Sequence, residues 1–151
     1  MRVIAKNKKA FFDYEILEKE IAGIKLQGHE VKSIKLGQVD MRGAYVVFFR
    51  GEPYLVGMNV PLYKHANSVS RAGYDPERKR KLLLTRKQIQ HFAFEREAKK
   101  LVLVPLAILE DHGLIKVEIA LARSLKKYDK REKQKRKDLQ RIREQAIKVG
   151  I

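Results

Sequence analysis

The sequence of 151 residues contains no cysteine. This absence excludes disulfide bonds, thiolate metal sites and cysteine nucleophiles, and it suits a reducing compartment. Long apolar runs are also missing, because the longest, residues 101–109, is far shorter than the roughly 20 residues of a membrane-spanning helix. Residues 1–6 do not form the unbroken apolar segment of a signal peptide. We therefore expect a cytoplasmic protein that does not act at a membrane.

Acidic residues are scarce, since 18 Asp and Glu stand against 34 Lys and Arg, a formal net charge of +16. An excess of this size requires an anionic partner, and nucleic acid and membrane surfaces are the abundant candidates. The excess is uneven: residues 123–151 carry 12 Lys and Arg against 4 Asp and Glu, a net of +8. The remaining 122 residues carry the other half and supply most of the apolar side chains for a core.

Residues 123–151 form a basic tail. Within it, residues 129–138 contain no apolar side chain and so cannot pack onto a core. Opposite charges four residues apart, such as Glu132 and Arg136, favour a helix, but each pair contributes only about 0.2–0.5 kcal/mol. The tail is then either a solvated extension or a segment that folds against a polyanion. We favour the second and expect it to be disordered alone and helical when bound.

The first 122 residues predict short strands interleaved with helices. We expect strands at 14–26, 44–49, 54–60, 101–109 and 114–122, helices at 28–36 and from Thr85 onward, and a loop at 61–81. Pro105 predicts an edge strand or a bulge. About six strands with two or three short helices favour a mixed β fold, a small OB-like antiparallel β-barrel. We expect residues 1–122 to form this RNA-binding barrel and residues 123–151 to form the tail.

No catalytic or metal-binding pattern is present. The four histidines lie in separate segments without the spacing of a metal-binding pair. Phosphate-binding loops, dinucleotide-binding loops and nucleophile elbows are absent as well. We therefore expect no enzymatic activity, no cofactor and no metal. An enzymatic or membrane-surface protein is the alternative that the histidines and the basic tail leave open.

Cations and aromatic rings occur together in the remaining segments. Residues 7–14, NKKAFFDY, combine them in the way that lets phosphate contacts and base stacking coexist. In residues 78–81, RKRK, the mutual repulsion of four cations calls for a polyanion, unless the run is a solvated turn. These patterns predict RNA contacts from the cations Lys8, Lys9, Lys32, Lys35, Arg78, Arg80 and Lys81.

The same segments resemble a known family. The strings NKKAFFDYEIL (7–17), AGIKLQGHEVKS (22–33), DPERKRKLLL (75–84), LVPL (103–106), KVEIALAR (116–123) and KKYDKRE (126–132) are similar to the SsrA-binding protein family, also called small protein B. They occur in the family's order and span nearly the whole chain.

The resemblance implies a factor of bacterial trans-translation. Such proteins bind the tRNA-like domain of transfer-messenger RNA. Through this RNA, elongation factor Tu and alanyl-tRNA synthetase are their indirect partners. They act as monomers on ribosomes stalled without a stop codon. The tail enters the empty mRNA channel beside the ribosomal RNA of the decoding site. By matching position, the RNA face includes or is supported by Asn7, Lys8, Tyr14, Lys32, Tyr45, Lys81 and Leu83, and the tail acts through Lys126, Lys127, Asp129, Lys130 and Arg131.

Two positions depart from the family's pattern. Ile21 replaces the usual Glu before Ala-Gly, and Glu20 should face the opposite side of the strand. Ser124-Leu125-Lys126 replaces the usual Gly-Lys-Lys at the start of the tail. The alternative interpretation of the charge is a general OB-type RNA-binding or ribosomal protein, which would not prefer a tRNA-like RNA.

Overall fold

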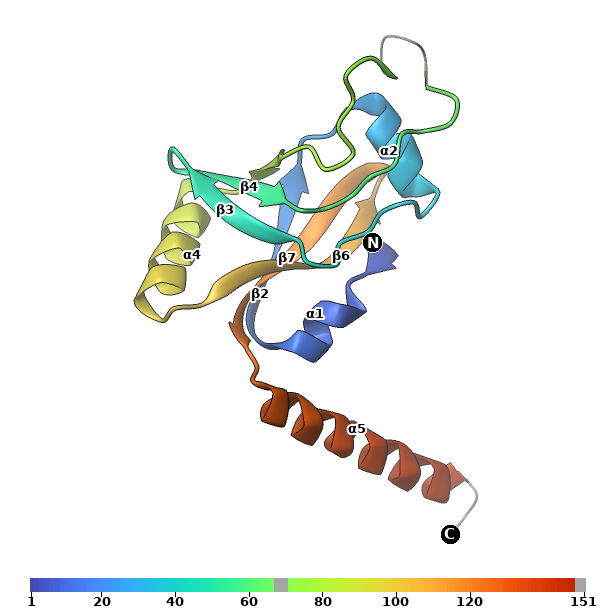
Figure 1. The fold of residues 1–151 in the computed structure, drawn as a ribbon, viewed down its shortest axis with the longest axis vertical. Helices are drawn as coiled ribbons and strands as arrows, with labels where there is room; N and C mark the ends of the chain where they lie inside the picture. The colour runs from blue at the N-terminus through green and yellow to red at the C-terminus, as the bar shows by residue number, and fades with distance from the viewer. Residues whose placement is uncertain (67–70, 149–151) are drawn as a thin grey trace.

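The computed structural model describes residues 1–66 and 71–148. The elements follow one another in the order β1 (Arg2–Lys6), α1 (Lys8–Asp13), β2 (Tyr14–Ile24), α2 (Gly28–Lys35), β3 (Tyr45–Phe49), β4 (Glu52–Val56), β5 (Arg80–Leu83), α4 (Arg86–Ala98), β6 (Val102–Asp111), β7 (Leu114–Ser124) and α5 (Lys127–Lys148). Figure 1 shows a curved sheet with α1 and α2 at opposite ends and α5 projecting away from it.

The sheet has seven strands in the order β1-β6-β7-β2-β5-β4-β3, and all the paired neighbours are antiparallel. It curls until β3 lies close to β6, but the described residues form no hydrogen-bonded ladder that closes the cylinder. The predicted OB-like β-barrel is therefore confirmed in outline, as a barrel-like sheet that stays open.

Strand β2 joins the two parts of the sheet. It pairs with β7 as far as Gly23 and with β5 at Gly23 and Ile24. A Cβ atom on Gly23 would lie 3.1 Å from Cβ of Leu83, so a side chain here would have to push Leu83 away by a few tenths of an ångström. Register shifts at 16–18 in β2 and at 105–107 in β6 add curvature. Of the two alternatives predicted for Pro105, the bulge is confirmed, and β6 lies between β1 and β7 rather than at an edge.

Strand β6 is buried on both faces. One face belongs to the main core inside the curled sheet, which includes Leu103 and Ile108. The other face packs under α1, where Ala10 lies against Val104 and Leu106. The strand reads as a continuous apolar run for this reason. In β7 the predicted alternation is confirmed, since Ile115, Val117, Ile119 and Leu121 all lie in the main core.

The N-terminal segment of the fold was not predicted. Strand β1 pairs with β6, and Asn7 begins α1 by accepting a hydrogen bond from the Ala10 amide at 3.3 Å. The predicted capping box of α4 is confirmed, because Thr85 and Gln88 exchange side chain to backbone hydrogen bonds. The loop prediction is wrong at its end, where Arg80 and Lys81 belong to β5. Residues 67–70 of that loop lie outside the described residues.

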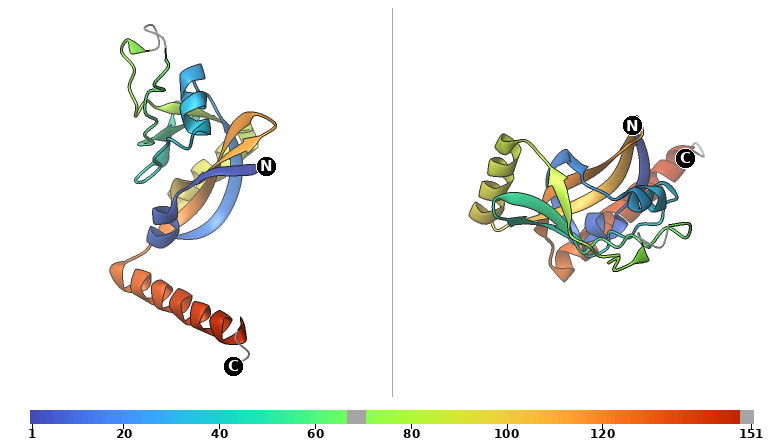
Figure 2. Two further views of the ribbon diagram at one scale, coloured as in Figure 1. Left: turned by 90° about the vertical axis from the view of Figure 1, so that its right-hand side faces the viewer. Right: turned by 90° about the horizontal axis from the view of Figure 1, so that it is seen from above.

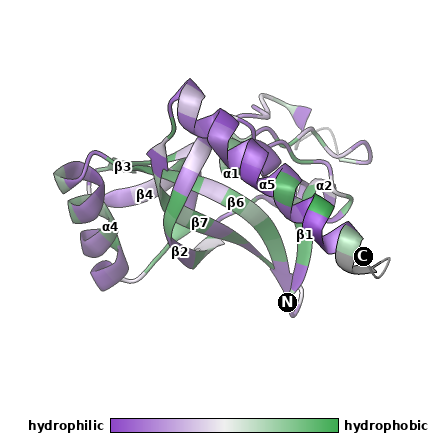
Figure 3. Cartoon of the chain, turned by 90° about the horizontal axis from the view of Figure 1, so that it is seen from below, coloured by the Kyte–Doolittle hydropathy of each residue, from purple (hydrophilic) through white to green (hydrophobic). Residues whose placement is uncertain are grey.

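The tail is drawn as one helix, α5, of 22 residues. Figure 3 shows that it is hydrophilic along most of its length, whereas β1, β6 and β7 are largely hydrophobic. Only its first turns approach the barrel, at α1 (Figures 1 and 2). Disorder of the unbound tail stays a prediction. None of the helices in the described residues is both long and apolar enough to cross a bilayer.

Candidate RNA-binding surface

A groove runs along one side of the barrel as three adjoining hollows. The first is lined by Lys8, Lys9 and Arg42 among others. The second shares Asn7 and Lys9 with the first and reaches Tyr14 and Gly43. The third shares Tyr14 and Gly43 with the second and ends at Tyr45 and Arg96. The strip 39–43 and α1 therefore bring cations and aromatic rings from distant parts of the sequence to one surface.

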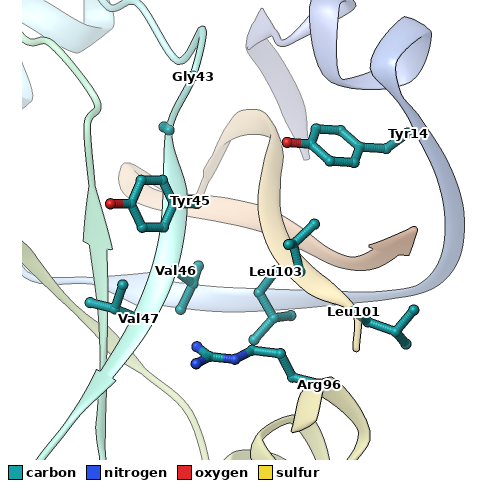
Figure 4. A pocket seen from close by; sticks show the side chains of 10 residues that line it. Tyr14, Gly43, Tyr45, Val46, Val47, Arg96, Leu101 and Leu103 are labelled. Atoms are coloured by element: carbon teal, nitrogen blue, oxygen red, sulfur yellow. The ribbon is translucent and has the colours of Figure 1, made fainter. Parts of the chain in front are cut away.

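The third hollow has a volume of about 420 Å³ and lies where β3 approaches β6. Figure 4 shows the rings of Tyr14 and Tyr45 on opposite sides of its opening, with Arg96 of α4 at the far end. Tyr45 is 50% exposed, although it lies in a strand. Open aromatic faces beside cations can stack on unpaired bases while the cations contact phosphates.

Asn7 fixes the elements that form this groove to one another. Its side chain is 4% exposed and donates hydrogen bonds to the carbonyl oxygens of Pro105 at 2.9 Å and Met41 at 3.3 Å. With the Ala10 amide donating to its Oδ1, the amide group is used fully inside the fold. Asn7 thus joins α1, β6 and the segment before β3, and it supports the groove rather than reaching into it.

Arg42 was missed by the sequence analysis. Its guanidinium is held by Asp40, with Nε donating to both carboxylate oxygens at 3.1 Å and Nη2 to Oδ2 at 2.8 Å. The hydrogen bonds from Arg42 hold the pKa of Asp40 below its usual value. The side chain of Arg42 stays 74% exposed at the groove. A signal existed in Asp40-Met41-Arg42-Gly43, an acid and a base two residues apart before a glycine, but it is too common to single out.

Two of the four cations of residues 78–81 share one carboxylate inside the protein. Glu30 of α2 is fully buried, and its carboxylate contacts Arg78 at 2.5 Å and Arg80 at 2.6 Å. Arg80 is itself 0% exposed and donates further hydrogen bonds to the carbonyl oxygens of Met58 and Pro76. Glu30 therefore relieves part of the repulsion in this run, because two of its four cations pair with that carboxylate. RNA contact by the run stays a prediction.

Burial alone would raise the pKa of Glu30. Hydrogen bonds from Arg78 and from the Gln27 amide, together with the charge of Arg80, outweigh that effect and lower the pKa below its usual value. Tyr74 donates to the carbonyl oxygen of Val60 at 2.7 Å. Burial and the charge of Glu30 raise the pKa of the Tyr74 hydroxyl. The cluster is a structural centre that fixes α2 to the start of β5, and Arg80 is enclosed within it.

The other predicted cations lie away from the groove. Lys32 and Lys35 are exposed on α2, at the end of the barrel opposite α1 (Figure 1). Lys81 on β5 lies 3.7 Å from Glu52, and its neighbour Leu83 is 49% exposed. The structure thus brings Asn7, Lys8, Lys9, Tyr14 and Tyr45 together, while it places Lys32, Lys35, Arg78, Lys81 and Leu83 on other parts of the barrel.

The departure at Ile21 is visible in β2. Ile21 pairs with Glu118 and Glu20 pairs with Ile119, so the two neighbouring side chains face opposite sides of the sheet. Glu20 instead accepts a hydrogen bond from the Ile21 amide at 3.1 Å. Glu20 is therefore not placed to replace a carboxylate at position 21.

The five predicted tail residues lie at the start of α5 or just before it. Lys126, Lys127, Asp129 and Arg131 are exposed, whereas Lys130 reaches Asp13 of α1 at 3.1 Å. No group of three or more His, Cys, Asp or Glu side chains able to hold a metal ion occurs in residues 1–66 and 71–148. An open β-barrel with a groove of cations and tyrosines and a basic helix is the architecture of a nucleic-acid-binding protein.

Comparison with known proteins gives the family. Residues 4–149 match the family model described as SmpB protein. The chain is 45% identical over 150 residues to the SsrA-binding protein of Sulfurihydrogenibium sp. (strain YO3AOP1), covering 99% of this chain and 97% of the relative. It is 44% identical over 151 residues to that of Pseudothermotoga lettingae, covering 99% of both chains.

A solved structure described as "tmRNA-SmpB: a journey to the center of the bacterial ribosome" is also similar. Its chain aligns with a TM-score of 0.67 and 40% identity, over 85% of this chain and 92% of that chain. Together with the match over nearly all of the sequence, this likeness means that the chain belongs to the SmpB family.

Proposed function

We propose that the protein binds the tRNA-like domain of transfer-messenger RNA and takes it to stalled ribosomes for trans-translation, without catalysing a reaction itself. The observation that carries the proposal is the groove, in which Tyr14 and Tyr45 line one hollow beside Arg96, with Lys8 and Lys9 in the adjoining hollows. The groove offers ring faces together with cations, as a folded RNA with unpaired bases requires. Membership of the SmpB family selects the RNA.

The predicted RNA-binding residues divide into two roles under this proposal. Lys8, Lys9, Tyr14 and Tyr45 contact the RNA in the groove. Lys32, Lys35, Lys81 and Leu83 are exposed or half-buried and contact parts of the RNA that extend over the barrel. Asn7, Arg78 and Arg80 act by holding the contacting elements in position, because their polar groups serve the fold.

The tail has the ribosome as its partner in this proposal. Lys126, Lys127, Asp129, Lys130 and Arg131 meet ribosomal RNA of the decoding site, and α5 follows the empty mRNA channel. The exposed cations of α5 support this, because phosphates neutralise such a surface and release counterions. Elongation factor Tu and alanyl-tRNA synthetase join through the RNA, and the site of action is the cytoplasm.

Competition binding tests the choice of RNA. At one fixed salt concentration, we expect the protein to prefer a tRNA-like domain transcript over an unrelated RNA of equal length. Equal affinities would support the alternative of a general RNA-binding protein. In the full chain, replacing Lys126, Lys127 and Arg131 by Gln should leave this binding intact and abolish rescue of stalled ribosomes in a translation extract.

Replacing Tyr45 by Ala tests the groove itself. We expect Tyr45→Ala to weaken binding of the tRNA-like RNA by about 1–3 kcal/mol, which is the usual contribution of base stacking. The salt dependence of binding should not change, because no cation is lost. Tyr128→Ala is the matched control, since Tyr128 is 72% exposed on α5. Equal effects of the two substitutions would place the RNA outside the groove.

A further inference from the structure

A second surface that joins cations to aromatic rings lies at the α2 end of the barrel, opposite α1 (Figure 1). Lys32 and Lys35 are exposed on α2, and Lys64 and Arg71 are exposed on the segment between β4 and β5. Residues 31–39 and 57–73, which supply these four cations, contain no Asp or Glu. Among the described residues, none of the four forms an ion pair. Their charge is therefore available to a partner.

Tyr63 lies beside these cations. Its ring is half-buried, and the ammonium group of Lys32 lies 5.7 Å from the centre of the ring. The exposed ring of His65 packs edge to face against that of Tyr63, with 5.4 Å between the ring centres. Unpaired bases can stack on such rings while neighbouring cations contact phosphates, whereas a double helix keeps the faces of its bases covered. This combination favours an unpaired segment of RNA over a duplex.

Residues 61–66 are held by hydrogen bonds at both ends. At the start, the hydroxyl group of the buried Ser33 on α2 donates to the carbonyl oxygen of Pro61 at 2.8 Å. At the end, Nε of Arg71 donates to the carbonyl oxygen of Ala66 at 2.9 Å, and Nη2 donates to that of Lys64 at 2.6 Å. Carbonyl oxygens carry no net charge, so Arg71 stabilises the segment and keeps its own positive charge. A surface that is already held in place loses less freedom when a partner binds.

The α2 end also continues into the groove. Lys35 is the last residue of α2, and Val39, four residues later, lines the first hollow of the groove. Four residues span at most about 14 Å, so an RNA strand that leaves the groove reaches Lys35 without leaving the protein surface. The occupant that suits both places is one and the same RNA.

We propose that Lys32, Lys35, Tyr63, Lys64 and Arg71 form a second RNA-binding surface, the α2-end surface, which takes an unpaired segment of the RNA bound in the groove. Phosphates of this segment contact the four cations, and one of its bases stacks on the ring of Tyr63. The identity of the RNA as a tRNA-like domain rests on the proposed function, whereas a surface for unpaired RNA does not.

Two substitutions of Tyr63 test the stacking, with a tRNA-like domain transcript as the probe. Tyr63→Leu keeps an apolar side chain but loses the aromatic ring, and we expect about fivefold weaker binding, the lower end of the range for base stacking. Tyr63→Phe keeps the ring and should bind as the parent protein does. Urea denaturation checks that both variants fold. Equal affinities of the two folded variants would overturn the proposal.

The salt dependence of binding tests the phosphate contacts. Lys64→Gln should lower the slope of log affinity against log salt by about 0.7–0.9, the value for one lost phosphate contact. Lys87→Gln removes the same charge from an exposed position on α4 and should leave the slope unchanged. Equal slopes in the two variants would remove the phosphates from the α2-end surface and overturn the proposal.

A double variant tests whether one RNA occupies both places. Tyr45→Ala with Tyr63→Leu should lower the affinity by the product of the two single losses, because separate contacts contribute independently. A double variant that binds no more weakly than Tyr45→Ala alone would overturn the proposal.

An unrelated single-stranded RNA of the same length distinguishes failure of the surface from failure of the proposed function. If the parent protein binds this RNA as tightly as the transcript, the proposed function fails. Weaker binding of the single-stranded RNA by Tyr63→Leu than by Tyr63→Phe would then still support the α2-end surface, and equal binding would overturn it as well.

Discussion

The barrel and the tail helix accommodate positive charge in opposite ways. Arg80 in the barrel is completely buried, and the carboxylate of Glu30 and several carbonyl oxygens surround its guanidinium. Most cations of α5 lie in water, and the ion pairs within the helix are loose, such as Lys135 with Glu132 at 3.6 Å. A buried ion needs a fixed partner because the interior does not solvate it, whereas water solvates the cations of α5.

This difference shows that a count of cations does not give the number available to RNA. Arg78 and Arg80 belong to the densest basic run of the barrel, yet both are bound to one carboxylate. Lys8, Lys9 and Arg42 of the groove and most cations of α5 are exposed, so charge that can be exchanged for counterions lies there. Substitutions in the two sets should therefore affect different measurements.

The largest effect should come from the buried carboxylate. Glu30→Gln leaves the buried guanidinium of Arg80 without its counter-charge, and we expect it to lower the free energy of unfolding by about 3–5 kcal/mol. Urea denaturation of the purified protein measures this. Glu144→Gln, an exposed acid on α5, is the control and should change stability by less than about 0.5 kcal/mol. Similar small losses for both variants would contradict the contrast between barrel and tail.

Acidification should have a smaller effect on protein stability than Glu30→Gln. The pKa of Glu30 is lowered in the fold, so its contribution is fully present above the unfolded pKa of about 4.3 and is lost as the pH falls through the folded pKa. Asp13, whose pKa the hydrogen bond from Lys9 and the contact with Lys130 lower, acts in the same direction. We expect the urea midpoint to fall below about pH 4.3 in the parent protein. The fall should be shallower in Glu30→Gln, and identical slopes would show that Glu30 is not ionised in the fold.

The smallest effect concerns single exposed cations of the groove. Lys8→Gln should lower the slope of log affinity against log salt by about 0.7–0.9, the value for one lost phosphate contact. Protein stability should not change, since Lys8 is exposed and the described residues give it no ion pair. Fluorescence titration of a tRNA-like RNA at several salt concentrations measures the slope. An unchanged slope would place Lys8 beside the RNA rather than on a phosphate.

Local patterns predicted those parts of the fold that depend on neighbours in the sequence. The alternation in β7 and the capping box of Thr85 and Gln88 are short-range features, and both are confirmed. Strand β1 was missed because five residues carry little pattern, and it forms only by pairing with β6. Helix α1 was missed because six residues rarely form a helix alone, so packing of Ala10 on β6 and β7 is decisive.

The site was predictable only in part for the same reason. The basic and aromatic segment 7–14 was recognised from its residues and Tyr45 from the family resemblance, but the groove also includes Arg42 and Arg96, which come from two other segments. Glu30 is 50 residues from Arg80 in the sequence, so no local pattern marks Glu30 as the shared counter-ion of Arg78 and Arg80. Long-range pairing of this kind is decided by the tertiary fold.

The hydrogen bonds of Asn7 have a consequence for how the chain folds during its synthesis. This side chain needs the carbonyl of Pro105, 98 residues later, and β1 needs β6 as its only paired strand in the described residues. This segment leaves the ribosome well before its partners and is therefore among the last parts of the fold to become fixed, since those partners have yet to be made. Until then its edge stays unsatisfied, and the nascent chain is most vulnerable to proteases and to wrong pairing in this interval.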